Sequence, residues 1–279
     1  MEPAGRLDYV DLYAAERGEL LGLLRDLKPD EWQLPTECPA WSVKGIVLHL
    51  LGDDLSILSR QRDGEPSRVA IEGAGNWDAL FAALDRHNER WVDATFELSV
   101  SLLFELLALA GEWTQRWYAT EPGWLGEPIP WIGPDASPKW LLCAREYLER
   151  WIHHQQIRRA TGRPDWFDPS WAVPAIAVGM RGFPQGFAIL PASDGATVTF
   201  SLDEGTAWTV RRDGEVWNLY DGAPTDPAVR FPLDVGTASL LFSRGLTKAG
   251  LSERLRPEGD SDLGSLVVAG LAAFFGRDD

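Results

Sequence analysis

Glu149 and His153 are the residues whose chemistry and spacing are most informative in this sequence. They stand four positions apart in a segment with helical periodicity, so their side chains are expected on one helix face, one turn apart. A carboxylate and an imidazole at this spacing can bind the same metal ion. A third ligand must come from another helix, and His49 is the candidate. It lies within the apolar segment 46–51, where a neutral imidazole is costly unless its nitrogens find partners.

Each of these residues also has a purely structural interpretation. His49 would then bond to a backbone carbonyl in the core, and Glu149 would pair with a nearby arginine. Glu146 precedes Glu149 by about one turn and is a rival metal ligand. His154 is expected to point about 100° away from His153 around the same helix, so it is not expected to bind the same ion.

The remaining histidine and the two cysteines favour structural roles. His87 lies in the strongly polar segment 85–89, which indicates a solvent-exposed helix face. Cys38 is expected to pack in the turn before the helix that carries His49, rather than to act as a nucleophile or a metal ligand. Cys143 has apolar neighbours, which predicts a core position. Two cysteines cannot form a disulfide framework, and they favour a reducing, cytoplasmic location.

Composition restricts the classes of partner. The 279 residues include 42 acidic and 26 basic side chains, which gives a formal net charge of −16. This charge argues against nucleic acid or an anionic membrane as the main partner, because both need a basic surface. No apolar stretch is long enough to span a bilayer, and the first residues lack the pattern of a signal peptide. The expected partners are small molecules, and the protein is expected to be a monomer or a homodimer.

Apolar residues recur at helical spacing through most of the first 165 residues. Ser42 is expected to cap the second helix and Gly162 to end the last one. Segment 121–136 is rich in proline and glycine and predicts a long loop, in which Trp124 and Trp131 either line a pocket or cover the end of the bundle. Four or five long helices in succession predict an antiparallel bundle. The expected helices are 9–27, 42–60, 77–98, 102–120 and 138–161.

The pattern becomes mixed after segment 163–170, which has the composition of a linker. The dipeptides Asp194-Gly195 and Asp213-Gly214 indicate hairpin turns. The sequence therefore predicts a mainly α protein in which a helical bundle, residues 1–165, precedes a smaller α+β domain, residues 170–279. The strands expected in the second domain are 187–190, 197–202, 207–211 and 216–220, and the expected helices are 235–243 and 263–275.

Two segments resemble motifs of a known family. Segment 36–50, which contains His49, resembles the pattern T-x-C-x-G-W-(S/T)-V-x-x-(V/I)-x-x-H-(L/I) of the DinB-like, mycothiol-dependent maleylpyruvate isomerase family, with Ala40 in place of the usual glycine. Segment 145–164 is similar to the E-x-x-x-H motif of this family and to its I-R-R-A-x-G-R-P continuation. Gln156 stands where this family often has aspartate. A glutamine at this position is similar to other DinB-like proteins. The two motifs lie about a hundred residues apart and in the same order as in the family.

The resemblance implies an up-down four-helix bundle that holds a divalent metal, usually zinc, through His49, Glu149 and His153. The C-terminal part is similar, more loosely, to a sterol-carrier-like α+β domain that is often fused to this bundle. In the family, an arginine of this second domain reaches the metal site. Arg244 is the expected counterpart, although the preceding residue is Ser243 where glycine is usual. The alternatives are Arg211, Arg212 and Arg230.

Two histidines and one carboxylate leave an open position on a divalent metal, as catalytic sites require. A thiol that arrives there loses its proton and becomes a nucleophile. In an isomerase, the thiolate adds to an electron-poor cis double bond and is expelled after rotation. In an S-transferase, the thiolate displaces a leaving group or opens an epoxide, and stays attached. The resemblance therefore implies a mycothiol-dependent isomerase or transferase acting on an electrophile such as maleylpyruvate. A non-catalytic metal-binding protein and a hydrolase that uses metal-bound water are the alternatives.

Overall fold

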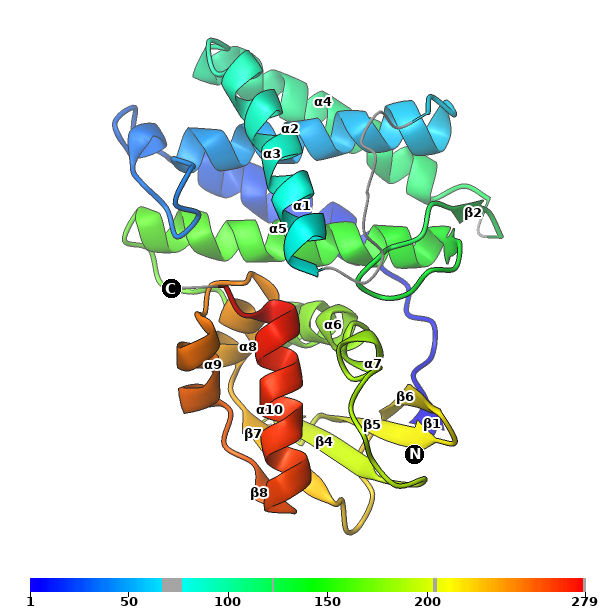
Figure 1. Ribbon diagram of the computed structural model, residues 1–279. Coiled ribbons are helices and arrows are strands. Elements are labelled where there is room, and N and C mark those ends of the chain that lie inside the picture. The colour runs from blue at the N-terminus through cyan, green and yellow to red at the C-terminus, as the bar shows by residue number, and fades with distance from the viewer. Residues whose placement is uncertain (67–76, 122, 203–204, 278–279) are drawn as a thin grey trace. The chain divides into compact units, whose positions relative to one another are not determined.

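The computed structural model describes residues 1–66, 77–121, 123–202 and 205–277 (Figure 1). The chain forms two compact units. The bundle unit contains residues 8–127 and 136–166, and the sheet unit contains Met1–Leu7, Pro128–Asp135 and Phe167–Asp279. A mainly helical chain with a sheet in its C-terminal part confirms the predicted fold class. The boundaries 1–165 and 170–279 remain a prediction of where independently folding domains would begin and end.

All five helices expected in the first part of the chain are present. Helices α1, α2, α4 and α5 pack into a four-helix bundle, and α3 packs against α2 and runs across the other helices in Figure 1. A short 3-10 turn, Glu31–Gln33, precedes α2, and a π-helical turn, Leu58–Arg62, follows it. The bounds are α1 Val10–Arg25, α2 Val43–Ile57, α3 Trp77–Thr95, α4 Val100–Tyr118 and α5 Lys139–Ala160.

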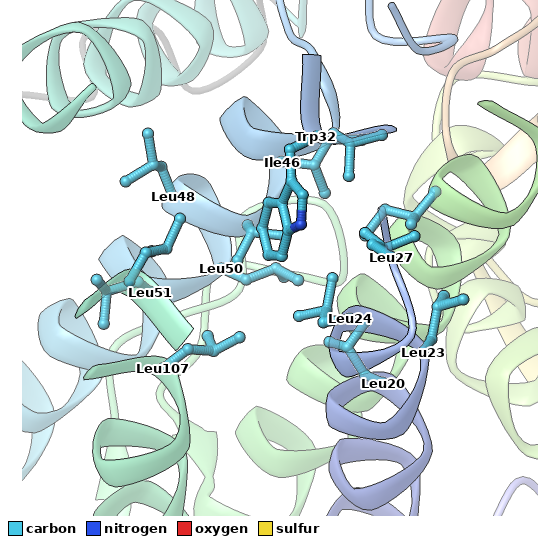
Figure 2. Close-up of a cluster of buried hydrophobic side chains, with 14 of the residues drawn as sticks. Leu20, Leu23, Leu24, Leu27, Trp32, Ile46, Leu48, Leu50, Leu51 and Leu107 are labelled. Atoms are coloured by element: carbon cyan, nitrogen blue, oxygen red, sulfur yellow. The ribbon is translucent and has the colours of Figure 1, made fainter. Parts of the chain in front are cut away.

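The bundle core is made mainly of leucines from α1, α2 and α4 (Figure 2). Helix α2 is the central element, since it is buried around most of its circumference and packs against α3, α4 and α5. Burying one leucine side chain contributes about 1.5–3 kcal/mol, so this cluster is a main source of bundle stability. The leucines labelled in Figure 2 are Leu20, Leu23, Leu24, Leu27, Leu48, Leu50, Leu51 and Leu107.

Two glycines of α2 allow tryptophans to lie directly on the helix. A Cβ on Gly45 would come within 2.9 Å of Trp41 Cβ, and a Cβ on Gly52 would come within 2.6 Å of Trp91 Nε1. Trp91 Nε1 donates a hydrogen bond of 2.7 Å to the carbonyl of Leu48, which attaches α3 to α2. Ser42 caps α2 as predicted, because its side chain accepts a hydrogen bond from the amide of Gly45. The start of α2 is therefore well defined, and His49 lies on it one turn after Gly45.

The sheet unit contains a six-stranded sheet with the order β1-β6-β5-β4-β7-β8, in which β4 and β7 are parallel. The aromatic side chains of Phe183 and Phe187 pack on the strands through Phe200 and Trp217. The strands are β1 Glu2–Pro3, β4 Thr197–Leu202, β5 Ala207–Asp213, β6 Val216–Asp221, β7 Val229–Leu233 and β8 Glu258–Gly259. The helices are α6 Pro169–Met180, α7 Phe183–Gly186, α8 Val235–Phe242, α9 Lys248–Arg254 and α10 Ser261–Phe275.

The sequence predictions for this unit were partly wrong. Segment 187–190 is not a strand: the Phe187 amide bonds back to the Phe183 carbonyl at 2.9 Å, so the segment closes α7. Asp194-Gly195 consequently forms a turn before β4 and not a hairpin, whereas Asp213-Gly214 does connect β5 and β6. Strand β7 was missed because it contains Pro232, which is uncommon within strands since it has no amide hydrogen to donate. Within the described residues, no helix has the length and apolarity needed to cross a membrane.

Candidate metal centre

His49 of α2 and the pair Glu149 and His153 of α5 bring their ligand atoms together inside the bundle unit. One ligand atom from each residue lies within 4.8 Å of the other two. Glu149 Oε1 is 3.1 Å from His49 Nε2 and 3.2 Å from His153 Nε2. Ligands about 2.0–2.1 Å from a tetrahedral zinc ion are separated by roughly 3.3 Å. The arrangement of these three side chains therefore fits a divalent metal without a large rearrangement.

The two imidazoles are almost fully buried, whereas the carboxylate is partly accessible. His49 is 3% exposed and His153 is 5% exposed, while the Glu149 side chain retains 29% of its exposure. Burial opposes ionisation of Glu149, but hydrogen bonds with His153 and His49 outweigh it and hold the pKa of this carboxyl well below its usual value. Glu149 is therefore a carboxylate, the form that binds a metal.

Gln156 orients His153. The amide oxygen Oε1 of Gln156 lies 2.7 Å from His153 Nδ1 and can only accept, so Nδ1 carries a hydrogen and Nε2 faces Glu149. Cys38 Sγ donates to the same amide oxygen at 3.3 Å. Burial disfavours the charged imidazolium, but hydrogen bonds with Cys38 and Glu149 raise the pKa of His153 to about 10. These contacts select the ring orientation that presents Nε2 as a ligand, a role that partners outside the ligand set commonly have.

Trp41 covers His49 from the loop before α2. The two rings are stacked, with centroids 4.8 Å apart and an interplanar angle of 29°. The loop is held by Thr36, whose hydroxyl donates to the Trp41 carbonyl at 2.8 Å and accepts from the Cys38 amide at 3.2 Å. Cys38 lies in this turn, as predicted, and its thiol points to Gln156. Trp41 and its loop therefore limit the movement of His49 and shield it from solvent.

Asp53 adds a second carboxylate to the centre, and this residue was not predicted from the sequence. Its Oδ2 lies 3.5 Å from His49 Nε2, and this buried atom accepts no hydrogen bond from the residues that the structure describes. The signal was available, because Asp53 follows His49 by four residues and so lies on the same face of α2. Asp53 and Glu149 together make the centre electronegative, and a cation would compensate both charges.

The other candidate residues of the bundle unit lie elsewhere. Glu146 is ion-paired with Arg145 and Arg150, so its carboxylate is not directed at the histidines. His154 is paired with the buried Glu16, 3.1 Å away. His87 is exposed and Cys143 is buried, as the sequence predicts for each. The structure shows a carboxylate as the partner of His49, where the structural interpretation expected a backbone carbonyl.

The arginines expected to bind substrate belong to the sheet unit. Arg244 follows the end of α8 with a φ of 53°, a left-handed conformation that usually requires glycine. Its amide bonds to the Leu241 carbonyl and the Gly245 amide bonds to the Leu240 carbonyl, which closes α8 in a Schellman motif. The role of Arg244 in binding substrate stays a prediction. Arg211 is engaged by Asp213 and Tyr220, Arg212 lies over the Trp217 ring, and Arg230 belongs to β7.

The two tryptophans of the long loop also fall in different units. Trp124 belongs to the bundle unit, where its ring packs against Trp117 with centroids 5.1 Å apart. Trp131 belongs to the sheet unit, where it lies against Gly182. A shared role of these two side chains in a pocket wall stays a prediction.

Comparison with known proteins identifies one family. The family model of the mycothiol maleylpyruvate isomerase N-terminal domain matches residues 13–158. Two crystal structures of mycothiol-dependent maleylpyruvate isomerase have a similar fold, and each comparison covers 90% of this chain and 91% of the other. A mutant with histidine replaced by alanine is 10% identical, with a TM-score of 0.56, and the second structure is 11% identical, with a TM-score of 0.54. No curated protein matches the chain.

The segment matched by the family model makes up more than half of the chain and includes His49, Glu149 and His153. The chain belongs to the mycothiol maleylpyruvate isomerase N-terminal domain family.

Proposed function

We propose that this protein is a thiol-dependent isomerase or S-transferase whose bundle unit holds a divalent metal through His49, Glu149 and His153. The observation that carries the proposal is the convergence of these three ligand atoms within 4.8 Å, from helices far apart in the sequence. Two imidazoles and a carboxylate are a donor set typical of zinc sites that keep a position open for a reactant. The surrounding groups are consistent with this role, because Gln156 orients one ligand and Trp41 covers another.

The family supports mycothiol as the thiol. The related crystal structures are of enzymes named for dependence on mycothiol and for action on maleylpyruvate. When bound, a divalent metal supplies the positive charge that favours the thiolate form of an incoming thiol. The accessible Glu149 marks the side of α5 from which thiol and substrate would reach the buried imidazoles. The substrate we propose is a small electrophile with an electron-poor double bond, of which maleylpyruvate is an example.

The reaction conserves every atom in the isomerase case. The thiolate sulfur forms a bond to one carbon of the cis double bond, and the electron pair of that bond moves toward the adjacent carbonyl. Rotation follows about the resulting single bond. The electron pair then returns, the carbon–sulfur bond breaks, and the trans product and the thiolate are released. In the S-transferase case, the thiolate displaces a leaving group or opens an epoxide, and the sulfur remains on the substrate. Arg244 is the residue of the sheet unit that we propose to bind the substrate carboxylate during this sequence.

The proposed partners follow from the charge of the chain. A formal net charge of −16 disfavours association with nucleic acid or anionic membranes. We therefore propose small-molecule partners. The two free cysteines support a cytoplasmic location, and we propose that the protein acts as a monomer or a homodimer.

The test is metal analysis followed by calorimetry with the thiol. Purified protein is expected to contain about one equivalent of zinc, and the zinc-loaded protein is expected to bind mycothiol. The substitutions His49→Ala, Glu149→Ala and His153→Ala should each weaken zinc binding by at least ~10-fold, because loss of a ligand exceeds the effect of losing an orienting partner. Exposed His87→Ala is the matched control and should bind zinc normally.

Each outcome separates the alternatives. Unchanged zinc affinity in all three variants would reject the metal centre. Zinc binding without any heat from mycothiol would favour a non-catalytic metal-binding protein. Hydrolysis of esters or amides by the zinc-loaded protein without a thiol would favour a metal-dependent hydrolase.

A further inference from the structure

Helix α5 has an accessible strip next to the candidate metal centre. Between Leu141 and Ile157, every residue of α5 is buried with the exception of Arg145 and Glu149. These two residues are four positions apart, so their side chains lie one turn apart on the same face of the helix. The Arg145 side chain is 34% exposed and that of Glu149 is 29% exposed. A guanidinium and a candidate metal ligand therefore share the accessible part of this helix.

Arg145 makes one hydrogen bond to a buried carboxylate, and most of its N–H groups have no acceptor among the described residues. Its Nη1 donates to Oε1 of Glu146, a residue that is 1% exposed. The described residues provide no other hydrogen-bond acceptor for Arg145, and none of its nitrogen atoms is both buried and unpartnered. An arginine presents five N–H donors in a planar fork. One buried carboxylate thus fixes the position of the guanidinium and leaves most of its donors for an external acceptor.

A buried charge network supports this carboxylate. Arg150 donates to Glu146 Oε2 at 3.1 Å and to Asp54 Oδ1 at 2.5 Å, and Tyr13 donates to the same Asp54 oxygen at 2.9 Å. All four residues are at most 1% exposed. Two carboxylates and the Arg150 guanidinium leave one negative charge, which Arg145 balances. Isolated buried charges are costly, so the network is neutral only with Arg145 in place.

The groups that face Arg145 keep it charged. Burial disfavours the guanidinium charge, but Glu146 on α5, Asp53 on α2 and Glu149 on α5 outweigh this effect and raise the pKa of Arg145 above its ordinary value. Oε1 of Glu149 is turned toward the two imidazoles and not toward Arg145. A metal at the centre would compensate the carboxylates there, and Arg145 would remain available to an anion.

We infer that Arg145 binds a second carboxylate of the substrate, distinct from the one proposed for Arg244, on the bundle unit itself and one helical turn from the metal centre. This inference rests on the proposed function, and it makes Glu146 a positioning residue for Arg145. The planar fork of arginine matches a carboxylate bidentately, which lysine cannot reproduce. The class of substrate is accordingly a small electrophile with a carboxylate close to its reactive double bond.

The test compares carboxylate binding by Arg145→Gln and Arg145→Lys proteins, both loaded with zinc. Calorimetry with succinate, an inert four-carbon dicarboxylate, should show binding to the unmodified protein and a loss of about tenfold or more in Arg145→Gln, the scale expected for a lost charged hydrogen bond. Arg145→Lys should recover part of the affinity. Zinc content and mycothiol binding should be unchanged in Arg145→Lys, which keeps the positive charge beside Glu146. The matched control is Arg116→Gln, which removes an exposed arginine of α4.

A second measurement does not depend on how the variants fold. The monomethyl ester of succinate should bind the unmodified protein more weakly than succinate does, because one carboxylate charge is removed. The inference is overturned if the unmodified protein binds no dicarboxylate, or if Arg145→Gln binds succinate as the unmodified protein does. Absence of zinc or mycothiol binding in the unmodified protein would instead count against the proposed function, so the two failures are distinguishable.

Discussion

Two neighbouring layers of the bundle use the same helices for opposite purposes. Each layer has a glutamate of α5 followed four residues later by a nitrogen-bearing side chain, and each adds a residue from α2. In one layer, Glu146 and Arg150 meet Asp54, and the guanidinium supplies the positive charge. In the other, Glu149 and His153 meet His49, and the layer contains no fixed positive charge.

The difference lies in where the cation comes from. A guanidinium is permanently charged, so the arginine layer has no need of an external ion. An imidazole that binds a metal gives a lone pair and no charge, and Asp53 adds a second carboxylate beside His49. The histidine layer therefore has the electrostatics of a site that takes a cation from solution. The two pairs on α5 also differ in burial. Glu146 and Arg150 are fully buried, whereas Glu149 is partly exposed to solvent.

The largest expected effect is on folding, in the arginine layer. Arg150→Met removes the cation between Asp54 and Glu146, which leaves Asp54 with the uncharged Tyr13 hydroxyl and Glu146 with Arg145. Breaking a buried pair in this way costs about 3–5 kcal/mol. The free energy of unfolding in urea, measured on the metal-free protein, should fall by this amount. In the same assay, Arg116→Met should lower it by less than about 0.5 kcal/mol, because this arginine is exposed. Equal effects of the two substitutions would contradict the role assigned to Arg150.

Glu146 illustrates how this network changes the choice of controls. From the sequence, Glu146 is a rival metal ligand, and Glu146→Ala would be a harmless control if another residue were the ligand. The structure places its carboxylate between two arginines in the core, so the substitution is expected to destabilise the bundle. His87, which is exposed, is the appropriate control for metal binding.

The features that could be predicted from the sequence are those with local signals. The five bundle helices follow from apolar periodicity, and the pairing of Glu149 with His153 follows from their spacing on one helix. His49 was identified because an imidazole in an apolar helix needs a partner. The arginine layer could not be predicted, because Asp54 and Arg150 are 96 residues apart and each looks like an ordinary helix-surface residue in isolation. From the sequence, Trp41 is one residue of a family motif with no assigned contact. Its position against α2 depends on Gly45, whose missing side chain leaves room for the ring.

The sheet unit was harder to predict for a physical reason. Strand β7 contains Pro232, which has no amide hydrogen to donate to a sheet. Its main partner β4 is parallel to it, so no hairpin turn in the sequence indicates that the two strands pair. Helix α6 was not predicted, and its first two residues were assigned to the linker 163–170; both Pro169 and Pro174 fall within this helix. Segment 187–190 has the composition of a strand, but Phe187 lies at the end of α7 and its ring packs in the core against Trp217. In each case, tertiary packing overrides local propensity.

An intermediate effect is expected from the residue that orients His153. Gln156→Leu keeps the side chain close in size but removes the oxygen that accepts from His153 Nδ1. Loss of such a partner typically weakens metal binding by about 10- to 100-fold. Zinc affinity, measured by competition with a chelator, should fall within this range, while the free energy of unfolding of the metal-free protein should change less than in Arg150→Met. Zinc affinity equal to that of the unmodified protein would show that the ring is oriented by other contacts.

The smallest expected effect is a pH dependence that separates the two layers. In the metal-free protein the pKa of His153 is about 10, above its ordinary value, so near neutral pH the ring carries a proton that a metal must displace. The sign follows: zinc affinity should rise with pH, by up to about tenfold per unit, until the pH approaches this pKa. The same raised pKa stabilises the metal-free fold fully below the unfolded pKa of about 6.5, and this contribution disappears as the pH rises through 10.

Proton release is the direct measurement of this effect. Zinc titrations in buffers of different ionisation enthalpy should report about one proton released per ion bound near neutral pH. Arg150 in the adjoining layer does not titrate in this range, so His153→Ala should abolish the release, whereas the exposed His87→Ala should leave it unchanged. Release of no proton by the unmodified protein would mean that His153 is neutral before the ion arrives, which would contradict its raised pKa.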